Sequence, residues 1–170
     1  MAKADHKGQT SRIRRNVQRY GAPYIPKGSQ GEIAICARCQ AIYQRRHWFF
    51  DEELFNGSKG QATARQVICP ACQKIEDNYP EEDVVLRGDF LGPHRGEIMN
   101  LVWNEEQRAK GLNPLERIVR ISESNGTLTV TTTNEKLAQR IGRALQKAYQ
   151  GEVSYRWSED TQYLRVEWAR

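Results

Sequence analysis

Four cysteines in two close pairs constrain this chain more than any other feature of its sequence. Cys36 and Cys39 form one C-x-x-C pair, Cys69 and Cys72 form another, and 29 residues separate the two pairs. A two-residue gap lets both thiolates of a pair turn toward one ion, and two such knuckles complete a tetrahedral sulfur shell. A full shell leaves no position for the water molecule that a catalytic zinc needs. The spacing therefore predicts a double-knuckle zinc ribbon that holds one structural zinc ion.

The sequence alone leaves three other roles open for the same cysteines: an iron–sulfur cluster, a redox pair and disulfides. Four thiolates can hold an iron–sulfur cluster. A thioredoxin-like redox pair would need one C-x-x-C at a helix N-terminus after a buried strand, and it would leave the second pair unexplained. Disulfides are less expected, because the sequence has neither an apolar signal segment nor an apolar run that could cross a bilayer. We therefore expect a cytoplasmic protein that does not bind membranes.

The N-terminal segment, residues 1–31, differs from the rest of the chain in charge. Its first 30 residues carry seven basic side chains and one acidic one, whereas the other 140 residues carry 19 basic and 20 acidic ones. So polar a segment cannot bury enough apolar surface to offset its ordering entropy, which predicts a disordered basic arm. The arm is either a solubilising tail or, as we expect, a contact for a polyanion such as RNA. Its predicted RNA contacts are Lys3, Lys7, Arg12, Arg14, Arg15, Arg19 and Lys27.

Three further units are expected after the arm. Residues 32–88 contain both cysteine pairs among short, irregular stretches and make up the predicted ribbon. Apolar residues at helical spacing after Pro93 predict a connecting helix within residues 89–114. Residues 115–170 are expected to form an α+β domain with a core that does not depend on the metal.

This last unit, residues 115–170, has the pattern of a ββαββ domain. Asn125-Gly126 suits a tight hairpin between the first two strands. A capping box over 132–135 opens a helix that ends at Gly151. Apolar residues then alternate along two final strands: Val153, Tyr155, Trp157, Leu164, Val166 and Trp168. The prediction is a four-stranded, mainly antiparallel sheet covered by one helix, so the fold class is α+β.

Two further groups of side chains are candidate RNA contacts. Arg45 and Arg46 lie between the cysteine pairs beside Trp48, which either stacks on a base or belongs to a small core near the metal. Basic residues also recur at three- and four-residue steps along the C-terminal helix, as an RNA-binding ridge or a solvated face. These residues are Lys136, Arg140, Arg143 and Lys147, of which the last three are predicted RNA contacts.

An enzyme is not expected. The sequence contains no G-x-S-x-G, no phosphate-binding loop with G-K-[ST] and no H-E-x-x-H, and its three histidines are far apart. Acidic residues do cluster at 51–53 and 81–83, but neighbouring acids in loops are usually solvated. We therefore expect neither catalytic residues nor a small-molecule substrate.

Several stretches together resemble a known family. With the C-A-R-C and C-P-A-C pairs, residues 96–106, 128–133, 137–142 and 148–151 look like a family of small, uncharacterised bacterial zinc-ribbon proteins. More distantly, the order of ribbon and α/β domain is similar to the N-terminal zinc-ribbon region of the archaeal and eukaryotic adaptor for large-ribosomal-subunit export. The first resemblance implies zinc and a bacterial origin, and the second implies ribosomal RNA as the polyanion.

These observations lead to one functional expectation. The chain is expected to be a zinc-ribbon RNA-binding protein associated with the ribosome, with ribosomal RNA and ribosomal proteins as partners. Its expected role in translation is that of an assembly, hibernation or quality-control factor. The alternatives are a DNA-binding or transcription-associated zinc-ribbon protein and a protein-binding adaptor.

Overall fold

Four helices and two β-sheets make up the part of the chain that the computed structural model describes. The described residues are 33–58, 64–79, 82–158 and 163–170. The predicted α+β class is confirmed, whereas the predicted basic arm lies outside the described residues. Among the helices described, none has both the length and the apolar character needed to cross a bilayer.

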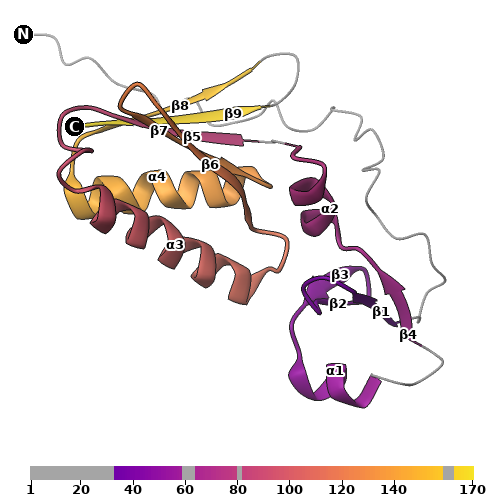
Figure 1. Ribbon diagram of the computed structural model, residues 1–170. Helices are drawn as coiled ribbons and strands as arrows, with labels where there is room; N and C mark the ends of the chain where they lie inside the picture. The colour runs from indigo at the N-terminus through magenta and orange to yellow at the C-terminus, as the bar shows by residue number, and fades with distance from the viewer. Residues whose placement is uncertain (1–32, 59–63, 80–81, 159–162) are drawn as a thin grey trace, which may run out of the picture.

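The smaller sheet carries the cysteine region, and its strand order is β3-β2-β1-β4. β1 pairs with β2 in antiparallel fashion and with β4 in parallel fashion. Two short helices follow β3 and β4, and Figure 1 shows them beside this sheet. The bounds are β1 Ile33–Cys36, β2 Ile42–Gln44, β3 His47–Phe49, α1 Glu52–Ser58, β4 Ala64–Val67 and α2 Pro70–Glu76.

The larger sheet has the strand order β6-β7-β5-β9-β8. Its central strand β5 pairs with β7 in antiparallel fashion and with β9 in parallel fashion. Two long helices, α3 and α4, lie on the same side of this sheet (Figure 1). The bounds are β5 Glu82–Arg87, α3 Arg95–Leu112, β6 Ile118–Ser124, β7 Thr127–Thr132, α4 Glu135–Tyr149, β8 Glu152–Trp157 and β9 Leu164–Ala169.

This sheet differs from the predicted one in strand number and in helix number. It has five strands instead of four, because β5, from the segment expected in the ribbon, lies between β7 and β9. Val84 and Leu86 of β5 are fully buried in the same core as α3 and α4. A central strand reads as a short apolar run without clear alternation, so its pattern does not reveal its partners. The helix expected only as a connector, α3, also covers the sheet.

The hairpin and the helix predicted within 115–170 are present, but the helix is capped by Asn134 rather than by Thr132 of the predicted capping box. Asn125 and Gly126 have φ angles of 48° and 71°, as a tight two-residue hairpin requires. The N-cap of α4 is Asn134, whose side-chain oxygen accepts a hydrogen bond from the backbone N–H of Leu137 at 3.1 Å. The helix ends at Tyr149, and Gly151 follows with a φ of 85°.

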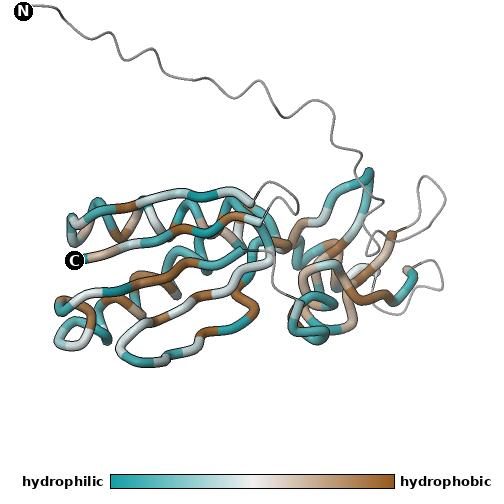
Figure 2. Tube along the Cα trace, turned by 90° about the horizontal axis from the view of Figure 1, so that it is seen from above, coloured by the Kyte–Doolittle hydropathy of each residue, from teal (hydrophilic) through white to brown (hydrophobic). Residues whose placement is uncertain are grey.

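Two apolar cores hold these layers. The larger core lies between the five-stranded sheet and its two helices, and Figure 2 shows apolar residues recurring among polar ones along these elements. The smaller core surrounds the cysteines. Leu115 packs against the smaller core, and the Lys74 ammonium of α2 donates a hydrogen bond to the carbonyl of Thr133 at 3.2 Å. The two regions are therefore in contact through α2 and the start of β6.

Candidate functional site

The four cysteine side chains converge on one point. Their sulfur atoms all lie within 4.8 Å of one another, and the Cys39 and Cys69 sulfurs are 3.6 Å apart. In a tetrahedral site with zinc–sulfur bonds of about 2.3 Å, the sulfurs stand about 3.8 Å apart. The structure thus brings together all four predicted ligands, which could bind one metal ion.

The first pair lies in the turn that follows β1. The Gln40 N–H donates to the Cys36 carbonyl at 2.9 Å, and the Cys36 N–H donates to the Ala41 carbonyl at 2.8 Å. Gln40 has a φ of 64°, a left-handed conformation that reverses the chain here. This compact turn aims Cys36 and Cys39 toward the second pair.

The second pair lies at the start of helix α2 rather than in a second hairpin turn. Cys69 is the N-cap, Pro70 is the first helical residue, and the Cys72 N–H donates to the Cys69 sulfur at 3.4 Å. Proline at the first helical position is a common start signal, so C-P-A-C could have indicated this helix. The cysteine cluster, a candidate metal site, therefore joins one C-x-x-C turn to one helix N-terminus, whose dipole also favours thiolates.

This helix start meets one requirement of the redox alternative but not the others. β4, which precedes α2, is an edge strand with exposed Arg65 and Gln66 instead of a buried strand. All four cysteines also form one cluster, whereas a thioredoxin-like redox site would use a single C-x-x-C pair. In an iron–sulfur cluster at least two of the four cysteines bind different irons and stand farther apart than the ligands of one ion. All four sulfurs lie within 4.8 Å of one another here, which fits a single ion better.

Burial and hydrogen bonding make the sulfurs unequal in the absence of a cation. Cys36 and Cys69 are fully buried, and the Cys69 N–H donates to the Cys36 sulfur at 3.3 Å. Hydrogen bonds from Cys39, Cys69 and Cys72 lower the pKa of the Cys36 thiol. Hydrogen bonds with Cys36 and Cys39 raise the pKa of the Cys69 and Cys72 thiols. A bound divalent cation removes this inequality, since it favours the thiolate form of every ligand.

Trp48 belongs to the core beside the cysteines. It is 7% exposed, and its ring centroid lies 5.2 Å from that of Tyr43. A ring this enclosed is unavailable for stacking on a base, so its prediction as an RNA contact is corrected to a core role.

No protein-family model and no curated protein matches this chain.

Arg45 and Arg46 form the tip of the hairpin between β2 and β3. Both are exposed, and their φ angles are 49° and 69°. Such a two-residue turn favours Asn-Gly, because side chains of other types are strained at positive φ. Strain of this kind recurs at functional sites. The turn therefore presents two arginine cations at an exposed position. An Asn-Gly sequence would make the same turn with less backbone strain.

The basic residues of α4 form a second group, which we call the α4 ridge: Lys136, Arg140, Arg143 and Lys147. Lys136, Arg143 and Lys147 are exposed, and Arg140 is partly exposed. Within the described ranges no carboxylate forms an ion pair with any of the four. Most other arginines there do have a carboxylate partner, as in Arg38–Glu76, Arg87–Glu167, Arg95–Glu123, Arg108–Glu105, Arg117–Glu106, Arg156–Glu167 and Arg165–Asp83.

The seven predicted contacts of the arm, Lys3 to Lys27, lie outside the described residues. Two exposed side chains and one partly buried side chain were missed at the sequence level. Arg120 of β6 is unpaired in the described part of the chain and lies on the sheet face opposite the helices, where polar residues alternate along the strand. Tyr155 and Trp157 of β8 are the other two, because their alternation indicated a core strand. Trp157 is nevertheless 49% exposed, since β8 lies at the sheet edge.

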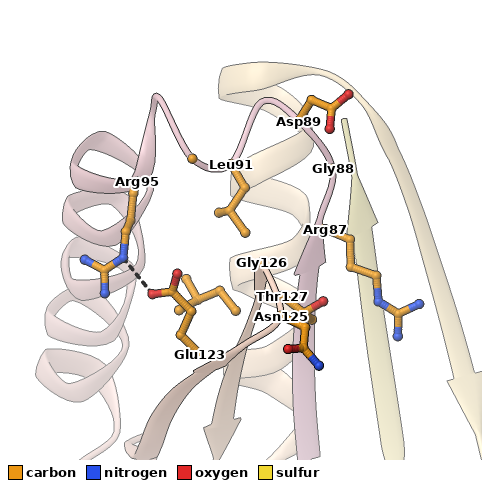
Figure 3. Close-up of a pocket in the computed structure, with 11 residues that line it drawn as sticks. Arg87, Gly88, Asp89, Leu91, Arg95, Glu123, Asn125, Gly126 and Thr127 are labelled. Carbon is orange, nitrogen blue, oxygen red and sulfur yellow. Dashed lines mark hydrogen bonds and ion pairs between the residues drawn. The ribbon is translucent and has the colours of Figure 1, made fainter.

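A polar cavity of about 420 Å³ lies at one end of the larger sheet. Figure 3 shows it between the loop after β5 and the β6–β7 hairpin, with Arg95 directed toward Glu123. These two side chains form an ion pair at 2.9 Å, while Arg87 points away from the cavity. The cavity has neither cysteines nor an excess of cations in its lining, so it is separate from both candidate sites.

Proposed function

We propose that this protein is a non-enzymatic RNA-binding protein in which Cys36, Cys39, Cys69 and Cys72 hold one structural zinc ion. Four buried or partly buried sulfurs at the spacing of a single tetrahedral ion support zinc as the metal. A shell filled by protein ligands stabilises a fold and leaves no coordination position for a substrate. The metal would thus fix the hairpin that carries Arg45 and Arg46.

The α4 ridge is the observation that carries the RNA proposal. Cations that pair with carboxylates cancel most of their field, whereas four unpaired cations on one helix face attract a polyanion. Lysine and arginine contacts with phosphates supply most of the sequence-independent affinity of such complexes. The strained Arg45-Arg46 tip adds a second, rigid phosphate contact.

The ribosome is the proposed setting, with ribosomal RNA and ribosomal proteins as partners in assembly, hibernation or quality control. The strongly basic segment before residue 31 and the resemblance to the export adaptor support this choice. Ribosome sedimentation of the tagged protein at low and high salt tests it. Co-sedimentation at low salt and release at high salt are expected, whereas migration away from ribosomes at every salt concentration would contradict the setting.

The decisive experiment measures RNA affinity as a function of salt for two triple variants. Arg140→Gln, Arg143→Gln and Lys147→Gln remove ridge cations, and the slope of log K against log [salt] should become shallower by ~2 units. The control removes the same charge from arginines that pair with carboxylates: Arg95→Gln, Arg108→Gln and Arg165→Gln. Its slope should change much less. Equal slopes for the two variants would refute a specific role for the ridge.

A further inference from the structure

We infer that the α4 ridge and the aromatic pair Tyr155–Trp157 form one binding surface for single-stranded RNA. The cations would contact phosphates, and the rings would stack on unpaired bases. This inference rests on the proposed function, which says nothing about strandedness or about β8.

The aromatic pair lies on the helix-covered side of the sheet. Tyr155 is opposite Val166 and Trp157 is opposite Leu164, and both partners are fully buried under the helices. Trp157 nevertheless keeps 49% of its surface exposed, because no strand lies beyond β8. The two rings are 6.4 Å apart between centroids and inclined by only 25°. The two rings are therefore nearly parallel neighbours at the edge of the sheet.

Tyr155 of the aromatic pair borders α4 directly. A Cβ atom built at Gly142 would lie 3.4 Å from the Tyr155 hydroxyl oxygen, so the helix and β8 meet at this point. Arg143 is the next residue of the helix. The Trp168 indole N–H donates to the Gln150 carbonyl, which places that end of β9 at the C-terminus of α4. Trp157 is at the opposite end of β8 and therefore lies toward the first turns of α4, where Lys136 is exposed.

The dimensions of the α4 ridge suit a short strand. Its cations are three or four residues apart, so they follow one face of the helix. From Lys136 to Lys147 the helix rises by about 16 Å, at about 1.5 Å per residue. A positively charged track beside stackable rings is the common design of proteins that bind single strands.

Both features together favour a single strand over a duplex. In a duplex the base faces are enclosed, so stacking on Trp157 would require an unpaired base. An acidic protein segment could match the cations, but it would leave the exposed Trp157 ring without a planar partner. Single-stranded RNA matches both the charge and the rings.

The test uses the full-length protein and a fluorescein-labelled 12-nucleotide RNA, offered single-stranded and as a duplex. Trp157→Ala should weaken single-strand binding roughly 5- to 150-fold, the loss expected for one stacked base, and should change duplex binding less than twofold. Trp157→Phe should retain most of the affinity. Trp103→Ala is the matched control, because Trp103 on α3 is similarly exposed, at 44%, but lies outside this surface.

A second readout is tryptophan fluorescence. Trp48 and Trp168 are buried, so RNA quenching should come mainly from Trp157 and should disappear in Trp157→Ala but persist in Trp103→Ala. Circular dichroism checks that each variant is folded, and Trp157→Phe keeps the test valid if Trp157→Ala unfolds.

The outcomes separate this inference from the proposed function. Salt-sensitive RNA binding that Trp157→Ala leaves unchanged, or an equal loss for single strands and duplexes, overturns the inference alone. Tighter binding of DNA of the same sequence, or equally Trp157-dependent binding of polyglutamate, overturns the choice of RNA. A wild-type protein that binds neither RNA form at low salt refutes the proposed function as well.

Discussion

The cysteine region and the five-stranded region are stabilised in different ways. The core of the cysteine region contains three cysteines, two alanines and Trp48 among its buried members. The core of the larger region contains sixteen buried apolar residues, which come from four of the five strands, from both long helices and from the loop after β5. Bulky apolar side chains supply most of the burial energy of a fold, so the larger region can be stable without a metal. The smaller region has little apolar burial, so we expect its stability to depend on a metal ion held by the four cysteines.

The largest expected effect is therefore that of metal removal. Structural zinc supplies on the order of 10 kcal/mol to small domains, so chelation or Cys39→Ser should unfold residues 33–79. Residues 82–158 and 163–170 should keep their structure. Hydrogen exchange resolved by segment measures both, and elemental analysis should find one zinc per chain. Unchanged protection of residues 33–79 after chelation, or a chain without zinc, would contradict the comparison.

Removal of β5 should have the next largest effect. A fragment of residues 112–170 lacks the strand between β7 and β9, so it should not fold, although the sequence alone suggested that this unit has its own core. A fragment of residues 82–170 should fold, since it contains the whole larger core. Amide NMR dispersion distinguishes the two fragments. Well-dispersed spectra from 112–170 would show that β5 is dispensable.

A smaller effect is expected where α4 meets the larger sheet. A Cβ atom at Gly142 would lie 2.7 Å from Val166 Cγ1, so Gly142→Ala should destabilise the larger region by about 1–3 kcal/mol. Gly96→Ala is the control, because nothing lies within 4 Å of its added Cβ, and it should be neutral or stabilising by up to about 1 kcal/mol. Urea unfolding measures both variants. Equal stabilities would mean that the helix shifts freely on the sheet.

The smallest effect concerns the hairpin tip of the cysteine region. Arg45→Asn with Arg46→Gly relieves the positive φ angles and should stabilise this region by about 1 kcal/mol, while RNA affinity falls. Arg45→Lys with Arg46→Lys keeps the charge and should retain the affinity without the gain in stability. Thermal unfolding and RNA titration measure the two properties. If the Asn-Gly variant binds RNA as tightly as the wild type, RNA binding does not explain the strained arginines at this turn.

The cluster of four cysteines, the Asn125-Gly126 hairpin and the helix that begins at Glu135 could be predicted from the sequence, although the N-cap is Asn134 rather than Thr132. Each of these features depends on residues a few positions apart, so spacing alone carries the information. Even the distant meeting of the two cysteine pairs follows from the chemistry of sulfur, because four thiolates in two close pairs suit one ion.

The pairing of β5 and the exposure of the tryptophans depended on the tertiary structure. The sequence left Trp48 open between an RNA contact and a core residue and placed Trp157 in an alternating apolar strand, whereas the structure buries Trp48 and leaves Trp157 49% exposed. Both lie on edge strands with similar local patterns, but Trp48 faces the cysteine core and Trp157 remains largely uncovered. Burial depends on what packs against a strand from elsewhere in the chain, and β5 pairs with residues of β9 that are 82 positions away. Neither is encoded in local periodicity.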